Sequence, residues 1–171
     1  MADPLDDILK RVSRSFYLSI HVLPAAVRGP IAVGYLVARA ADSIADTEVV
    51  PPGERLDLLR ELGAAVRGAG PDLGALQLRV DGLLPPSAVN EDERRLLQRL
   101  SDCLRWLRRL DGGDRQLVQR VLGTLITGME RDLGRFPAPE GPAGVAPERV
   151  VAMRTLADLD EYTYFAAGCV G

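Results

Sequence analysis

The stretch that decides the fold is AAVRGPIAVGYLVARAADSIAD, residues 25–46. Between Gly29 and Ala41 it carries a single charged residue, Arg39. A helix with so little charge has most of its circumference packed against other elements. Pro30 is tolerated in such a helix only in or near the first turn. We therefore predict a largely buried helix over residues 25–45, ended by the segment 47–53 with its two prolines.

This helix carries one polar stripe. At about 100° per residue, Tyr35, Arg39, Asp42 and Asp46 fall within an arc of roughly 60°. Two carboxylates one turn apart repel each other, and a charge buried without a partner is costly. Arg39 can neutralise only one of the two carboxylates.

A divalent cation would compensate both carboxylates. Mg²⁺ is typically held by one or two carboxylates, several waters and substrate phosphate oxygens. The D-x-x-x-D spacing of Asp42 and Asp46 therefore indicates a magnesium site. A solvated helix face without function is the alternative, and the spacing by itself does not separate the two interpretations.

The remainder of the chain also favours helices. Ala, Leu, Val and Arg are abundant, aromatic residues make up 5%, and no segment alternates as a strand would. We predict an all-α fold, and 171 residues are enough for one domain with a substantial core. Its other helices are expected at about 4–19, 54–67, 91–110 and 115–135, with one short helix inside 68–90 and a last helix from about 148 to the end. Residues 136–147 are predicted to be a loop.

Composition excludes several function classes. The formal net charge is −3 and the arginines are spread among acids, so we predict no nucleic-acid partner. Cys103 and Cys169 form no metal-binding or disulfide pattern. The acidic N-terminus is unlike a signal peptide, and no apolar run is long enough to span a bilayer. A cytoplasmic location is expected, with peripheral contact to a membrane left open.

Three blocks together resemble one known family. They are SRSFYLSIHVLP at 13–24, YLVARAADSIAD at 35–46 and DLDEYTYFAAGCVG at 158–171. In this order they resemble the squalene/phytoene synthases, and most closely the bacterial squalene synthase-like branch. The resemblance implies an isoprenoid synthase-type helical bundle, of which this chain would be the N-terminal portion. The second aspartate-rich motif of the family would lie in the C-terminal half, beyond these residues.

The resemblance also implies roles for individual residues. Asp42 and Asp46 would hold Mg²⁺ as the first aspartate-rich motif, and Arg39 and Arg14 would meet the diphosphate. Tyr162 would stand beside the reacting carbons as a proton carrier or cation stabiliser. Further substrate contacts would come from Ser13, Phe16, Tyr35, Ala166 and Val170, and Asp132 would lie on a helix that faces the cavity.

The implied activity is the head-to-head condensation of two prenyl diphosphates by a magnesium-dependent prenyltransferase. Farnesyl diphosphate, giving presqualene diphosphate and squalene, is the leading substrate, and geranylgeranyl diphosphate, giving phytoene, is the alternative. NADPH would serve a squalene synthase, with its site mostly outside this chain. Because about half of the family's metal-binding carboxylates would lie beyond these residues, we expect little or no synthase activity from this fragment alone. A non-catalytic family member acting as an assembly factor is the alternative of another class.

Overall fold

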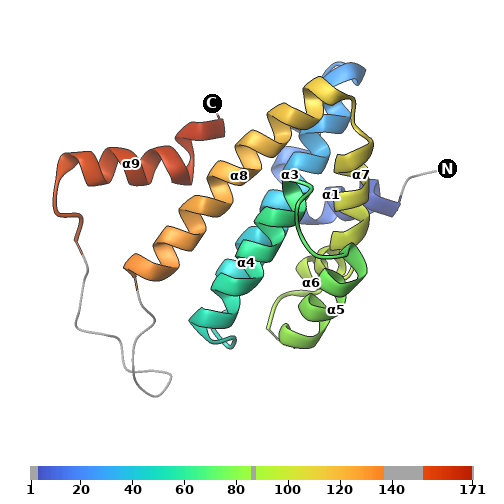
Figure 1. Ribbon diagram of the computed structural model, residues 1–171. Helices are drawn as coiled ribbons and strands as arrows, with labels where there is room; N and C mark the ends of the chain where they lie inside the picture. Colours follow the sequence, from blue (N-terminus) through green and yellow to red (C-terminus); the bar gives the residue numbers. More distant parts are fainter. Residues whose placement is uncertain (1–3, 86–87, 137–151, 171) are drawn as a thin grey trace.

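The chain forms a helical bundle whose computed structural model describes residues 4–85, 88–136 and 152–170 (Figure 1). The described residues contain helices and no strand, which confirms the all-α prediction. In chain order the helices are α1 (Pro4–Ser13), α2 (Ser15–His21), α3 (Ala25–Ala45), α4 (Pro52–Val66), α5 (Leu73–Leu83), α6 (Glu91–Leu97), α7 (Leu100–Arg109), α8 (Gly112–Arg135) and α9 (Leu156–Ala166), followed by a 3₁₀ turn, η1 (Gly168–Val170).

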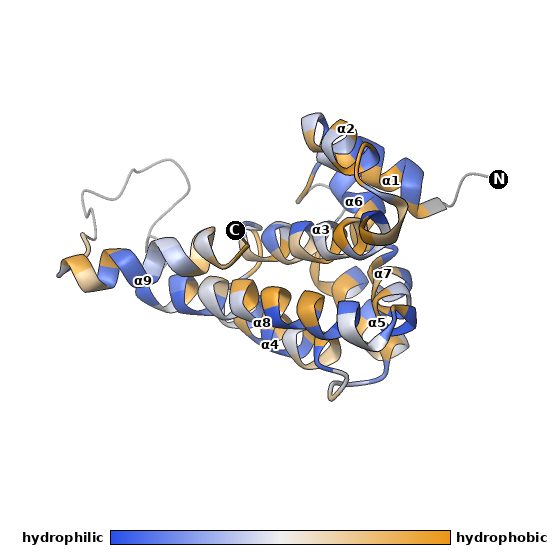
Figure 2. Cartoon of the chain, turned by 90° about the horizontal axis from the view of Figure 1, so that it is seen from above, coloured by the Kyte–Doolittle hydropathy of each residue, from blue (hydrophilic) through white to orange (hydrophobic). Residues whose placement is uncertain are grey.

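Helix α3 lies at the centre of the bundle. It contacts α4, α7 and α8 along its length and α1, α2 and α6 at its sides, and Figure 2 shows it between these two groups of helices. Val33, Leu36 and Val37 have no exposed surface. The predicted bounds of this helix are confirmed, and Pro30 lies within it. The apolar residues of α3 are used in packing against these neighbours. Its polar stripe, defined above, is therefore the part of the helix that is free to form a functional site.

The first predicted helix is broken in two at Arg14. This residue has a φ of 45° and ψ of −109°, a conformation that residues with a Cβ rarely adopt. Arg14 is the one non-glycine residue with positive φ among those described. Periodicity gave no sign of this break, and the prediction of one helix over 4–19 is wrong at this point. Helix α2 ends at His21.

The other predicted helices differ mainly at their ends. The helix expected over 91–110 is divided into α6 and α7 at Gln98 and Arg99. Helix α8 begins at Gly112 because the Asp111 side chain accepts hydrogen bonds from the N–H groups of Gly113 and Asp114.

The last helix was predicted too early. It begins at Leu156, where Thr155 and Asp158 form a capping box, and it ends at Ala166. Residues 152–155 are not helical. The predicted start near 148, and most of the predicted loop, lie outside the described residues.

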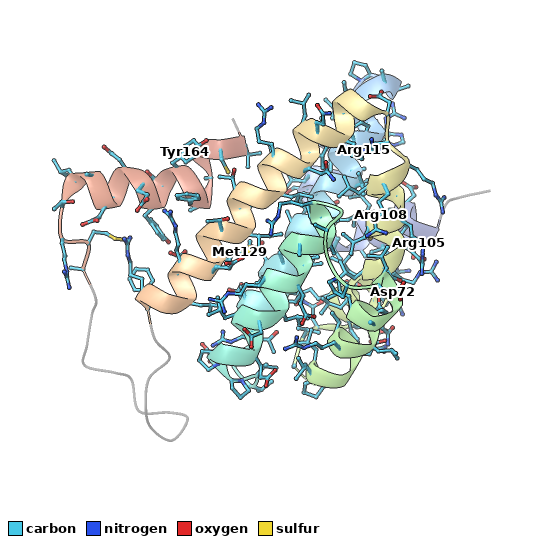
Figure 3. The ribbon with its side chains drawn as sticks, viewed as in Figure 1. Asp72, Arg105, Arg108, Arg115, Met129 and Tyr164 are labelled. Carbon is cyan, nitrogen blue, oxygen red and sulfur yellow. The ribbon has the colours of Figure 1, made fainter. Side chains whose placement is uncertain are left out.

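Helix α9 packs mainly against α8, apart from its own 3₁₀ turn. It has no buried residue, and its apolar Leu156 and Tyr164 are largely exposed. Figure 3 shows Tyr164 on α9 and Met129 on α8. The contact is close at Gly128, where an added Cβ would stand 2.8 Å from the Phe165 Cβ. Among the described helices, none is long and apolar enough to cross a membrane.

Candidate functional site

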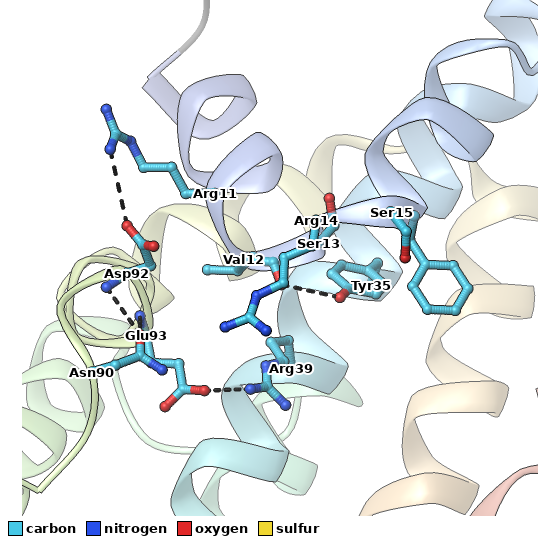
Figure 4. Close-up of a pocket in the computed structure, with 11 residues that line it drawn as sticks. Arg11, Val12, Ser13, Arg14, Ser15, Tyr35, Arg39, Asn90, Asp92 and Glu93 are labelled. Atoms are coloured by element: carbon cyan, nitrogen blue, oxygen red, sulfur yellow. Dashed lines mark hydrogen bonds and ion pairs between the residues drawn. The ribbon is translucent and has the colours of Figure 1, made fainter.

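The stripe of α3 lines two cavities. The first, which we call the arginine pocket, has a volume of about 280 Å³ and lies where the α1–α2 junction, α3 and the start of α6 meet (Figure 4). Arg11, Arg14 and Arg39 bring three guanidinium groups to it, so it has the chemistry of an anion site. Its other walls include Ser13, Phe16, Tyr35, Asp92 and Glu93.

Arg39 is held between two carboxylates. Its Nη2 donates a hydrogen bond to Glu93 Oε1 from α6, and its Nη1 lies 3.7 Å from Asp42 Oδ2. The side chain of Glu93 is 16% exposed, whereas that of Asp42 is 47% exposed. The contact with Glu93 joins two helices and is the tighter of the two.

Tyr35 connects the α3 stripe to the α1–α2 junction. Its hydroxyl donates to the backbone carbonyl of Val12 at 3.3 Å, and its ring centroid lies 6.1 Å from that of Phe16. Burial raises the pKa of the Tyr35 hydroxyl above its ordinary value. Ser13 is buried beside it and donates to the carbonyl of Leu9. These contacts fix the wall on which Arg14 stands.

The second cavity, which we call the aspartate cavity, has a volume of about 430 Å³ and lies between α3, α8 and α9. Asp42 and Asp46 line it from α3, and Asp132 lines it from α8. Burial, with a smaller contribution from the charge of Asp46, raises the pKa of Asp42. Burial also raises the pKa of Asp132. Apolar residues complete the lining, among them Met129, Phe136, Phe165 and Ala166.

The end of α3 that carries the two aspartates is anchored by buried polar groups. Thr47 donates from its hydroxyl to the carbonyl of Ser43 at 2.5 Å, and Arg55 of α4 donates from Nη1 to the carbonyl of Ala45 at 2.5 Å. Arg55 is only 6% exposed, and its Nε has no hydrogen-bond partner among the described residues. A cation at a helix C-terminus complements the helix dipole. Arg55 thus fixes the turn at which Asp46 leaves the helix.

Helix α9 is held on α8 by charge and aromatic contacts. The Arg131 guanidinium carbon lies 4.4 Å from the centroid of the Phe165 ring, and Arg131 also pairs with Glu161. The ring of Tyr162 lies edge-on to Phe136, with centroids 6.4 Å apart. Phe136 and Phe165 line the aspartate cavity, so α9 closes one of its sides.

The structure brings most of the predicted site residues to these two cavities. Ser13, Arg14, Phe16, Tyr35 and Arg39 line the first, and Asp42, Asp46, Asp132 and Ala166 line the second. Tyr162 and Val170 line neither, although Tyr162 packs on a lining residue. The acidic pair is also less buried than the sequence suggested, because Asp46 is exposed.

Two site residues were missed by the sequence analysis. Glu93 belongs to the run of acids after Asn90, whose side chain caps α6, and acids in a first turn are normally explained by the helix dipole. Arg55 looked like a surface residue of an amphipathic helix. Neither position carries a local signal, because both act on α3 from other helices, α6 and α4.

The described residues contain no group of three or more His, Cys, Asp or Glu side chains placed to hold a metal ion. Asp42 and Asp46 are the two carboxylates that α3 presents to the aspartate cavity. Two carboxylates are within the number that Mg²⁺ uses when waters and phosphate oxygens supply its other ligands.

The arrangement is an all-helical bundle whose central helix presents Arg39 to one cavity and the D-x-x-x-D pair to the other. The family model described as squalene/phytoene synthase matches residues 9–171, and the chain belongs to this family.

Relatives and a solved structure agree with this assignment. The chain is 27% identical over 172 residues to the squalene synthase LSS of Botryococcus braunii, covering 96% of this chain and 29% of that protein. It is 24% identical over 164 residues to the squalene synthase of Schizosaccharomyces pombe, covering 96% of this chain and 31% of that protein. The solved structure of TcSQS with the ligand BPH1237 matches with a TM-score of 0.69 at 25% identity, over 97% of this chain and 40% of that one. The chain thus spans less than half the length of each of these proteins.

Proposed function

We propose that the protein containing this chain condenses two prenyl diphosphates head to head, with farnesyl diphosphate as the substrate and presqualene diphosphate and squalene as products. Membership of the squalene/phytoene synthase family supports the reaction class. The observation that carries the proposal is the α3 stripe, which presents Arg39 to one cavity and Asp42 and Asp46 to the other.

The residues of the aspartate cavity fit a magnesium ion. Asp42 and Asp46 supply hard oxygen donors one helical turn apart, and burial raises the pKa of Asp42 although Arg39 acts against this rise. Bound there, Mg²⁺ would supply Lewis-acid stabilisation of the leaving diphosphate. We propose these two carboxylates as its ligands in this part of the protein.

The arginine pocket would bind the diphosphate group itself. Arg14 reaches it from the α1–α2 junction and Arg39 from α3, and each guanidinium can donate two parallel hydrogen bonds to phosphate oxygens. Donors already fixed by the fold stabilise developing negative charge without reorganising during the reaction. Ser13, Phe16 and Tyr35 form the adjoining wall and would orient the first carbons of the prenyl chain.

Apolar walls would protect the carbocation formed when diphosphate leaves. Met129, Phe136 and Phe165 line the aspartate cavity and limit the access of water to it. We propose that Ala166 and Val170 line the path of the prenyl tail, and that Tyr162 stabilises the cation or carries a proton. None of the described residues is assigned to NADPH.

A binding experiment on the 171-residue chain tests this proposal. Farnesyl thiodiphosphate, an unreactive analogue, is titrated by calorimetry with and without Mg²⁺. We expect Mg²⁺-dependent binding, and we expect Asp42→Asn to weaken it by about ten-fold or more, because half of the carboxylate charge at the ion is lost. Glu48→Gln is the matched control, since Glu48 is an exposed acid close to Asp46.

Retention of full Mg²⁺-dependent binding by Asp42→Asn would contradict the proposal and favour a non-catalytic scaffold. Competition with geranylgeranyl thiodiphosphate separates the two substrate lengths. Since the chain spans 29% to 31% of the curated relatives, we also propose that it has little or no synthase activity alone. Incubation with farnesyl diphosphate, Mg²⁺ and NADPH, followed by product analysis, checks this.

A further inference from the structure

Glu93 forms an ion pair with Arg39, whose guanidinium the proposed function assigns to the substrate diphosphate. It reaches Arg39 from α6 (Glu91–Leu97), and the two residues are 54 positions apart in the chain (Figure 4). The ion pair is part-buried, since the side chains of Glu93 and Arg39 are 16% and 34% exposed. Charge-assisted bonds of this kind are stronger than those at an open surface.

The second acid of the pocket behaves differently. Asp92 Oδ1 lies 4.0 Å from Arg11 Nη1, and both side chains are more than 40% exposed. Arg14 has no carboxylate within ion-pairing distance among the described residues. Of the three guanidinium groups in the pocket, Arg39 is thus the one bound tightly by a carboxylate of another helix.

We propose that Glu93 is a positioning residue of the diphosphate site, which holds Arg39 in the arginine pocket and whose carboxylate an incoming diphosphate must replace. The inference rests on the proposed function of that pocket. A carboxylate oxygen and a phosphate oxygen accept the same guanidinium hydrogen bonds. Glu93 therefore sets the affinity for the diphosphate group by competing with it for Arg39, and it keeps Arg39 from closing fully on Asp42.

The proposal predicts a gain of anion affinity when Glu93 is neutralised. Inorganic pyrophosphate is titrated into the 171-residue chain in EDTA, so that no metal takes part. We expect Glu93→Gln to bind pyrophosphate about five-fold more tightly than the wild type, since an ion pair of about 1 kcal/mol no longer has to be broken. Asp92→Asn removes the same charge from the same pocket without removing a partner of Arg39. We expect it to raise the affinity for pyrophosphate by about two-fold or less.

A double-mutant cycle shows whether the effect passes through Arg39. In an Arg39→Met background, the gain from Glu93→Gln should fall to that from Asp92→Asn. Glu93→Ala is a second variant with the same expected direction, should the glutamine variant not fold. A purely structural role of Glu93 would instead lower the affinity for pyrophosphate.

The inference is overturned if Glu93→Gln binds pyrophosphate no better than Asp92→Asn, or if its gain persists without Arg39. It also fails if no variant binds pyrophosphate. In each of these cases Mg²⁺-dependent binding of farnesyl thiodiphosphate by the wild type decides whether the proposed function survives. If that binding is absent as well, both proposals are wrong.

Discussion

The arginine pocket and the aspartate cavity share one wall, α3, but differ in how their other walls are held. The pocket is closed by contacts between α1, α3 and α6, including the Tyr35 hydrogen bond to Val12 and the Arg39 pair with Glu93. The cavity depends on α9, which has no buried residue and packs mainly against α8 among the helices described. The arginine pocket is therefore held by the helices of the bundle, whereas the aspartate cavity is closed by a helix that packs on the bundle surface.

This difference predicts different sensitivities. Local opening has a low free energy where few apolar contacts are buried, so α9 should open before the rest of the bundle. The anion-binding half of the site should then persist when the half with the acidic pair is perturbed. The following changes test that separation, in order of decreasing expected effect.

Gly128→Ala should displace α9 and leave the arginine pocket intact. The added Cβ would stand 2.8 Å from the Phe165 Cβ and 3.3 Å from its carbonyl oxygen, so the helices must separate. We expect a loss of about 1–3 kcal/mol in the stability of the docked state, as for other overpacked sites. Hydrogen exchange over residues 156–166 should become faster, while exchange in α3 changes little.

Gly123→Ala is the matched control for this change. Gly123 lies on the same helix. Apart from the neighbouring backbone of α8, no atom lies within 4 Å of a Cβ added at this position. It should stabilise α8 by roughly 0.5–1 kcal/mol, because alanine favours the helix. Unchanged exchange of α9 in Gly128→Ala would show that the close contact with Phe165 does not hold the helix.

Arg14 gives a test within the arginine pocket. Arg14→Gly and Arg14→Ala both remove the guanidinium, so both should bind pyrophosphate more weakly. The glycine variant should be the more stable by about 1 kcal/mol, because only glycine adopts a φ of 45° without steric cost. Chemical denaturation measures the difference. Equal stability of the two variants would mean that the Arg14 backbone is not strained.

The fold was largely predictable because hydrophobic periodicity and helix-breaking residues such as proline act locally in the sequence. The bounds of α3 follow from its apolar run and from the break after Ala45. The division at Arg14 was not predictable from local patterns, because the carbonyl of Val12 beside it accepts a hydrogen bond from Tyr35 of another helix. The late start of α9 followed from the Thr155–Asp158 capping box, a signal that was present in the sequence and was overlooked.

The site was predictable where it lies on one helix. The spacing of Tyr35, Arg39, Asp42 and Asp46 defines a stripe without reference to any other element. It does not show that the stripe is divided between two cavities, because that depends on where α6, α8 and α9 pack. Glu93 and Arg55 were missed for the same reason, since their partners are 54 and 10 residues away in the chain.

The smallest expected effect concerns the stability of the aspartate cavity itself. The pKa of Asp42 is raised above its ordinary value of 3.8, so its ionised form is less favourable in the folded chain than in the unfolded one. The cost is present at pH 7 and disappears as the pH falls below the unfolded pKa, where the carboxyl is protonated in both states. Asp42→Asn should therefore unfold at higher denaturant concentration than the wild type at pH 7.

The gain should be about 0.5 kcal/mol or less, because nearly half of the Asp42 side chain is exposed and screened by water. It should shrink toward zero at pH 3, and Glu48→Gln should show no such pH-dependent gain. A variant that is less stable at pH 7 would mean that the ion pair with Arg39 outweighs desolvation. Asp42 would then stabilise the fold. In that case its burial would no longer be an argument that the acidic pair binds a metal ion.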